Sequence, residues 1–330
     1  MEVRTDGSET VVRSKRPESL STDLTTPAGQ LLVEADLPMP KLTVRGTTLK
    51  RDVSFQFKSE TEGLTVQELL GTLVNPVGVL LSLALDIDTP PVSLEVESPR
   101  GEWMRVVHPL IEADDVEPPR HVLLWREQLD LSMIGAWLGK ANELSPVPQL
   151  VAGVAFGPSS RTLENQLLEL ATAAEGLHRR LFPSERLMSR SKAERTARDA
   201  SYAVLGDVRQ LVRERLAHLE EPSYRDRLNK LIERAGGSAG MVGSPEEWVG
   251  RVLPARNGFA HRLTGGKGAD MDEHLVLMLS LRWFLATLLL LEAGVDPSLL
   301  QLRLGEHQPY LHFLRQARRW LPDVYREASG

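Results

Sequence analysis

The longest apolar stretch of the chain, LVLMLSLRWFLATLLLL from Leu275 to Leu291, constrains most strongly what the protein can fold into. It is short for a helix that crosses a bilayer, and it carries Arg282 near its middle. As a helix it is apolar on nearly all sides, and such a helix is stable in water only when other elements surround it. We therefore predict that it is the central helix of a bundle, and we expect no membrane span.

A second helix is predicted where apolar residues recur at alternate spacings of four and three, which places them in one stripe. These residues are Leu163, Leu167, Leu170, Ala174, Leu177 and Leu181. Another helix is expected from about Ala193 to Leu219, and one more between a cap at Ser223 and a stop at Gly236. The pattern predicts an all-α bundle over residues 158–330, long enough to bury its own core.

The first half of the chain has a mixed pattern. Residues 1–29 are polar with few large apolar side chains and predict a flexible tail. Residues 30–150 alternate strand-like runs with helical spacing, with Thr65 as a helix cap and Pro76 as a break. HVLLWREQ, from His121, is among the expected strands. The predicted fold class is an α+β N-terminal module followed by the helical bundle.

Charge and composition restrict the partners. The net charge is −6, but residues 1–150 hold 14 basic and 23 acidic residues (−9), whereas residues 151–330 hold 25 and 22 (+3). A polyanionic partner should therefore meet the second half. The chain has no cysteine, which excludes thiolate catalysis and cysteine-bound zinc, and it shows no signal peptide. We expect a cytoplasmic protein.

The sharpest motif lies in the predicted bundle, in the stretch VLPARNGFAHRLTGG. It contains Arg256, Asn257 and His261 in the order R-N-x-x-x-H. On a helix, Asn257 and His261 are separated by four residues and share a face, and the long side chain of Arg256 can reach the same cleft.

This segment resembles the signature of the HEPN ribonucleases. ARNGFAHRL is similar to the Arg-Asn-x-x-x-His segment of the Apea-like HEPN branch, and LLELATAAEGLHRRLF resembles the first helix of that branch. The α+β half resembles the ApeA-like N-terminal domain that accompanies it in abortive-infection proteins, although it is shorter. The resemblance implies a homodimer with a composite site, no metal and no other cofactor. It also implies RNA cleavage by attack of a ribose 2′-hydroxyl on the neighbouring phosphate, which leaves a 2′,3′-cyclic phosphate.

The residue types suit this chemistry. Histidine exchanges protons near neutral pH, so His261 can serve as an acid or a base. The planar guanidinium of Arg256 can stabilise the charge that grows on the phosphoryl oxygens, and Asn257 can orient the histidine or the phosphate. We see no carboxylate-rich cluster with metal-ligand spacing. His307 and His312 are spaced like metal ligands, but we see no set of acidic or sulfur ligands that would complete a site with them.

Two further groups allow two interpretations each. Glu175 and His178 on the first helix lie either at the rim of the same cleft or form an ordinary exposed pair. A run of cations either tracks the RNA backbone or forms a solvated surface. The cations singled out for RNA binding are Arg179, Arg180, Arg186, Arg190 and Lys192.

The prediction is a metal-independent endoribonuclease of HEPN type, in antiphage defence or a toxin-like role. Its expected substrate class is transfer RNA or messenger RNA, and its N-terminal domain would sense a phage-derived trigger or a partner. The alternative is a non-catalytic HEPN module that binds RNA or a protein partner and serves for dimerisation or signalling.

Overall fold

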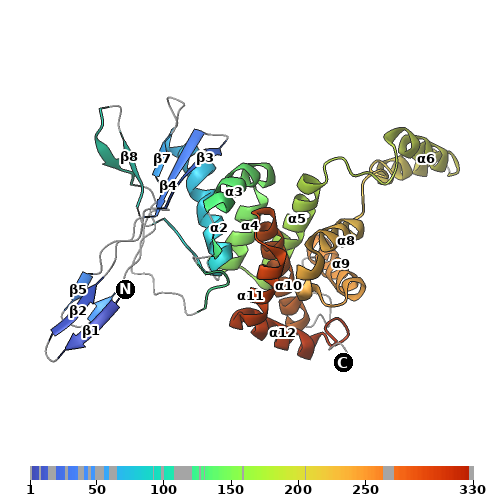
Figure 1. The fold of residues 1–330 in the computed structure, drawn as a ribbon. Coiled ribbons are helices and arrows are strands. Elements are labelled where there is room, and N and C mark those ends of the chain that lie inside the picture. Colours follow the sequence, from blue (N-terminus) through green and yellow to red (C-terminus); the bar gives the residue numbers. More distant parts are fainter. Residues whose placement is uncertain are drawn as a thin grey trace.

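The computed structural model describes residues 65–91, 93–97, 100–107, 121–125, 128–129, 131–157, 160–204, 206–262 and 271–326. It also gives the backbone of seven strands between residues 2 and 58. The side chains of Leu131, Asp207 and residues 259–262 are outside the description. Figure 1 shows strands at the N-terminal end, followed by a helical body that ends near the C-terminus.

The strands form small antiparallel sheets, ordered β1-β2, β3-β4-β7, β5-β6 and β8-β9. Their registers pair Glu2 with Arg13, Leu20 with Ala35 and Glu95 with Arg105. The strands are β1 (Glu2–Asp6), β2 (Glu9–Arg13), β3 (Leu20–Thr26), β4 (Gly29–Ala35), β5 (Lys41–Thr43), β6 (Gly46–Thr48), β7 (Gln56–Lys58), β8 (Glu95–Glu97) and β9 (Trp103–Arg105).

The described residues of the first half include four α-helices and one π-helical turn. They are α1 (Val66–Leu69), the π-helical turn η1 (Leu70–Val74), α2 (Asn75–Leu85), α3 (Leu131–Leu144) and α4 (Val147–Phe156). Thr65 caps α1 and forms a capping box with Glu68, as its position predicted. The π-helical turn ends just before Pro76, where the sequence predicted a break, because proline cannot donate the backbone hydrogen bond of a continuous α-helix.

Helices make up most of the described residues of the second half. It comprises α5 (Leu163–Leu181), α6 (Arg190–Tyr202), α7 (Gly206–Arg215), α8 (Tyr224–Ala235), the 3₁₀ turns η3 (Gly236–Ser238) and η4 (Gly240–Val242), α9 (Pro245–Arg262), α10 (Met271–Glu292), α11 (Pro297–Glu306) and α12 (Gln308–Trp320). The helical second half is the predicted one, whereas the α+β class of the N-terminal module stays a prediction.

Two expectations about elements need correction. The single helix predicted from Ala193 to Leu219 is two helices, because α6 ends at Tyr202 and α7 begins at Gly206. Residues 121–125 form no strand; they are an irregular segment whose Leu124 N–H donates to the carbonyl of Ala84. Strands β1, β2 and β3 are assigned within residues 1–29, and the flexible tail expected there stays a prediction.

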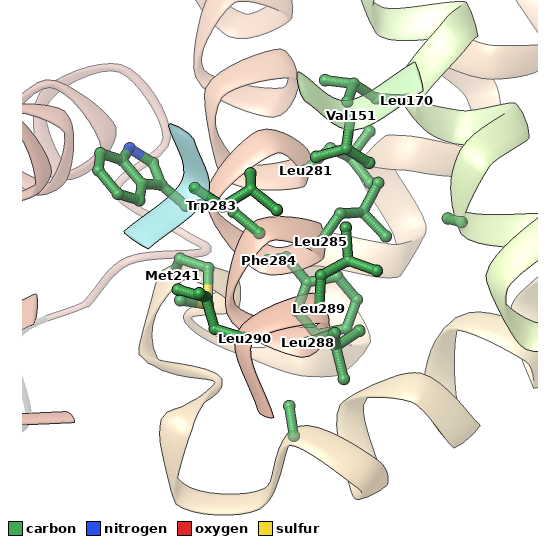
Figure 2. Packing of buried hydrophobic residues seen from close by; sticks show 14 of the residues in the cluster. Val151, Leu170, Met241, Leu281, Trp283, Phe284, Leu285, Leu288, Leu289 and Leu290 are labelled. Atoms are coloured by element: carbon green, nitrogen blue, oxygen red, sulfur yellow. The ribbon is translucent and has the colours of Figure 1, made fainter. Parts of the chain in front are cut away.

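Helix α10 is the centre of the core, as predicted. Its buried residues point to all sides of the helix, and Figure 2 shows Leu281, Phe284 and Leu288 of α10 among side chains from neighbouring elements, including Leu170. Trp248 of α9 donates from Nε1 to Ser280 Oγ at 2.8 Å, so the polar atom of a buried tryptophan is satisfied. Val66–Leu85 and Met271–Glu292 are both long and apolar enough to cross a membrane; 39% and 72% of their apolar windows are buried in the protein.

The N-terminal helices share this core. Leu80 of α2, Trp137 of α3 and Val151 of α4 belong to the same buried cluster as Leu170 and Phe284. Trp137 donates from Nε1 to the carbonyl of Pro76 at 2.7 Å. The helices that precede residue 157 are therefore packed onto the bundle, whereas the domain boundary placed between residues 150 and 158 stays a prediction.

A cluster of polar side chains also joins the N-terminal helices to the bundle. Asp86, the C-cap of α2, accepts hydrogen bonds from Arg282 of α10 and, at 2.8 Å, from His307 Nε2. The side chains of Asp86 and His307 are 8% and 1% exposed, and Arg282 also lies over the ring of Trp283. We predicted no acidic partner for His307, and that was wrong, because Asp86 comes from a distant part of the chain.

The cap of α8 gives a test of local stability. Ser223 Oγ accepts from the Asp226 N–H at 3.2 Å, and Asp226 Oδ2 accepts from the Ser223 N–H at 3.0 Å. Ser223→Ala should lower the free energy of unfolding by about 1 kcal/mol, because it leaves helix-terminal N–H groups without their acceptor. Urea unfolding measures the change, with the exposed Ser184→Ala as the control. Equal midpoints for the two variants would contradict the role of this cap.

Candidate functional site

The predicted motif lies on α9. Arg256, Asn257 and His261 all fall within the helix, which confirms that the segment is helical. Asn257 and His261 are therefore about one turn apart on the same face, whereas Arg256 is rotated from His261 by about 140°. Asn257 is exposed, and the side chain of His261 lies outside the described residues.

Arg256 is held where α5, α8 and α9 meet. Its Nη2 donates to Glu175 Oε2 of α5 at 2.9 Å, and its guanidinium lies 4.5 Å from the centroid of the Tyr224 ring. Tyr224 is fixed in turn, because its hydroxyl donates to the carbonyl of Ala171 at 3.1 Å. Burial raises the pKa of Tyr224 well above its usual range, so its ring stays neutral below the guanidinium.

The fixed guanidinium still has donors available. Its side chain is 28% exposed, so part of the guanidinium is open to solvent. Arginine carries five N–H donors, and within the described part of the chain only Glu175 accepts from Arg256. This arrangement can present a partly exposed cation to a phosphate while Tyr224 and Glu175 restrict its orientation.

Glu175 belongs to a longer charge network. Arg179 donates to Glu175 at 3.2 Å and to Glu221 at 2.9 Å, and Glu221 also accepts from Arg227 at 2.9 Å. Arg179 and Arg227 hold the pKa of Glu221 below its usual value despite the opposing effect of its partial burial. Glu175 is thus no ordinary exposed residue: it contacts the predicted catalytic arginine. Arg179, one of the cations predicted to bind RNA, is shared between two carboxylates.

His178 lies in the interior, below this network. Its side chain is 1% exposed, and Nε2 is 2.6 Å from Glu185 Oε2, an ion-pair contact whose angles fall outside regular hydrogen-bond geometry. Its Nδ1 is 3.4 Å from Arg227 Nη1, and its ring packs against Phe182. The expectation of an exposed pair was wrong for this residue, because the α5 stripe is wider than the apolar residues alone indicate.

The buried imidazole predicts a pH-dependent stability. Burial lowers the pKa of His178 below its ordinary value; Glu185 opposes this shift, and Arg227 and Arg179 add to it. The unfolded chain therefore binds a proton that the folded chain resists, so stability is full above about pH 6.5 and falls as the pH drops below that value. Urea midpoints at pH 7.5 and 5.5 should differ more in wild type than in His178→Gln. The exposed His312→Gln should keep the wild-type difference, and an unchanged difference in His178→Gln would contradict the assignment.

The remaining cations predicted to bind RNA differ in their surroundings. Arg180 donates from Nε to the carbonyl of Ser145 at 2.7 Å, and Arg186 donates to two nearby backbone carbonyls. Arg190 pairs with a glutamate one turn along α6. Lys192 is exposed and forms no ion pair with any described residue. A role of these residues in RNA binding stays a prediction.

Tyr224, whose ring lies against the Arg256 guanidinium, was not predicted from the sequence. Its only local signal was its place directly after the Ser223 cap, and the contact with Arg256 joins residues 32 positions apart. Over the described residues, no group of three or more His, Cys, Asp or Glu side chains is placed to hold a metal ion.

Comparison with known proteins identifies the region that carries this site. Residues 168–299 match the family model described as Apea-like HEPN. No curated protein and no solved structure shows significant similarity to the chain. The matched residues run from α5 into α11 and include Glu175, Tyr224, Arg256 and His261. Residues 168–299 are therefore similar to Apea-like HEPN domains, over less than half of the chain.

Proposed function

We propose that the HEPN domain is a metal-independent endoribonuclease in which Arg256, Asn257 and His261 act on the scissile phosphate. The observation that carries the proposal is the placement of Arg256: its guanidinium is oriented by Tyr224 and Glu175 and remains partly exposed. It shares α9 with Asn257 and His261. The family match supports the same assignment, because HEPN domains are commonly ribonucleases.

The proposed reaction needs no group beyond side chains and RNA. The ribose 2′-oxygen forms a bond to the adjacent phosphorus as the bond from phosphorus to the 5′-oxygen breaks. His261 of one subunit takes the 2′-hydroxyl proton, and an imidazole of the second subunit protonates the leaving 5′-oxygen. Arg256 stabilises the charge on the non-bridging oxygens. The products are a 2′,3′-cyclic phosphate and a 5′-hydroxyl.

One motif supplies a single histidine, so the proposal includes a homodimer with a composite site. We place the activity in the cytoplasm, in antiphage defence of the abortive-infection type or in a toxin-like role. Transfer RNA or messenger RNA is the proposed substrate. The N-terminal module would receive a phage-derived trigger or a partner.

Product analysis tests this proposal. The purified full chain is incubated with transfer RNA and with a single-stranded RNA in the presence of a chelator, and the RNA ends are identified by mass spectrometry. We expect cleavage with 2′,3′-cyclic phosphate and 5′-hydroxyl ends. Cleavage that requires a divalent cation, or that leaves 3′-hydroxyl ends, would contradict the mechanism.

One observation favours a second candidate, a non-catalytic HEPN module. In the single chain Arg256 is already paired with the Glu175 carboxylate, as an arginine with a purely structural role would be. Such a module would bind RNA or a protein and transmit a signal through dimerisation. Retained dimerisation and a retained cellular phenotype in Arg256→Ala would support it over the nuclease.

A further inference from the structure

Helices α6 and α7 form a hairpin that stands away from the helical body (Figure 1). We call residues 190–215 the arm. At its base, the Leu187 N–H donates to the carbonyl of Glu220 at 2.8 Å, which holds the two ends of the arm together. Ala193, Ala197 and Ser201 are the buried residues of α6, and Arg209 of α7 donates to the carbonyl of Ser201.

The arm has little core of its own. Its helices have 13 and 10 residues, and the buried side chains of α6 are small. Helices of this length are marginal in isolation, so a ligand that binds the arm would also stabilise it. The form of the arm therefore points to a bound partner.

The charge of the arm indicates which partner. The arm holds 7 basic and 4 acidic residues, a net charge of +3, so the rest of the chain carries −6 − 3 = −9. Its exposed cations that form no ion pair with a described residue are Lys192, Arg195, Arg198, Arg213 and Arg215. A basic arm on an acidic protein complements a polyanion.

An aromatic side chain lies among these cations. Arg195, Arg198 and Tyr202 follow one another at spacings of three and four, which places them in one stripe along α6. Tyr202 is 59% exposed, and the Arg209 guanidinium lies 4.9 Å from its ring centroid. Exposed tyrosine beside guanidinium groups is the combination on which unpaired bases stack while arginines contact phosphates.

The base of the arm lies beside the candidate site. Successive contacts lead from Arg256 to Glu175 at 2.9 Å, to Arg179 at 3.2 Å and to Glu221 at 2.9 Å. Glu221 directly follows the residue that closes the base of the arm. One network of ion pairs thus joins the candidate site to the base of the arm.

From these observations we infer that the arm is a binding surface for single-stranded RNA, with phosphates on Arg195, Arg198 and Arg213 and a base on Tyr202. The inference rests on the proposed ribonuclease function. It assigns RNA binding to the arm instead of to the five cations that the sequence suggested. Of those five, only Lys192 lies on the arm without an ion pair to a described residue.

The test measures binding separately from cleavage. The full chain with His261→Ala serves as the parent, so that RNA stays intact, and the probes are a fluorescent single-stranded RNA and a transfer RNA. The variant adds Arg195→Gln, Arg198→Gln and Arg213→Gln. Its matched control adds Arg315→Gln, Arg319→Gln and Arg326→Gln, which remove the same charge at and just beyond α12, at the other end of the bundle from α6 in Figure 1.

We expect the arm variant to bind the single-stranded probe about tenfold or more weakly than the control. The slope of log Kd against log salt should fall by about 2, since each lost phosphate contact removes about 0.7. Tyr202→Ala should weaken binding about fivefold to a hundredfold, and Tyr202→Phe should restore it, because phenylalanine keeps the stacking surface.

Three results would overturn the inference: an arm variant that binds like its control, a parent that binds neither probe, or an arm that serves dimerisation instead. Val208 and Leu211 of α7 are 40% and 52% exposed, so the last case is tested with Val208→Asp and Leu211→Asp. Loss of the dimer in sedimentation, with RNA affinity unchanged, would assign the arm to a second copy of the chain. Absence of cleavage in wild type, with arm-dependent binding intact, would remove the nuclease and keep the RNA-binding arm.

Discussion

Replacing His261 with alanine is expected to lower the rate of RNA cleavage by about a hundredfold to ten-thousandfold. In the proposed reaction the variant loses the group that moves protons between the 2′-hydroxyl, the 5′-oxygen and solvent, and no backbone group at that position can substitute for it. Single-turnover rates with excess protein measure this chemical step. Binding of RNA should be nearly unchanged, because the substitution removes none of the arginines and lysines that would contact the phosphate backbone.

The exposed His312→Ala is the matched control, since it removes an imidazole from α12 and should cleave like wild type. Arg256→Ala should also be impaired, but Arg256→Lys should recover little, because an ammonium group lacks the planar fork. Both Arg256 variants should still form the proposed homodimer. Equal cleavage by wild type and His261→Ala would show that a contaminating nuclease or another residue is responsible.

Replacing Asp86 with alanine is expected to destabilise the protein by about 3 kcal/mol, because it leaves His307 and Arg282 without their buried acceptor. Arg282 is 18% exposed, so water can reach part of the lost partner and the cost should lie near the lower end of the range for buried pairs. Thermal unfolding measures the effect as a fall of about 6–12 °C for a domain of this size. Asp88→Ala, two residues along the chain and exposed, should change little.

A second variant separates the charge from the backbone. Asp86 has φ of 55°, in the left-handed region that glycine adopts without cost and alanine does not. Asp86→Gly should therefore lose less stability than Asp86→Ala, by about 1 kcal/mol. If Asp86→Ala unfolds at the same temperature as Asp88→Ala, the cluster does not hold the N-terminal helices to the bundle.

Several elements could be predicted from the sequence because their signals are local. Three of these signals are the stripe from Leu163 to Leu181, the Ser223 cap and the apolar run in α10. Each depends only on residues within a few turns of one helix. A break between Tyr202 and Gly206 was missed because apolar spacing continues across it. The segment at residues 121–125 was misread because Leu123 and Leu124 are buried in an irregular loop, and burial alone selects apolar residues in loops and strands alike.

The motif and its helix were determined by the sequence alone: the residue types and spacing of Arg256, Asn257 and His261 indicate the chemistry, and the local pattern places them on α9. Tertiary structure alone decided what surrounds them. Glu175 is 81 positions from Arg256, and Asp86 is 221 positions from His307. Helical periodicity predicts which side chains face inward, but it does not predict which distant side chains they contact there. That choice depends on how α5, α8, α9 and α10 pack, so the partners of each buried charge emerge only when the bundle is assembled.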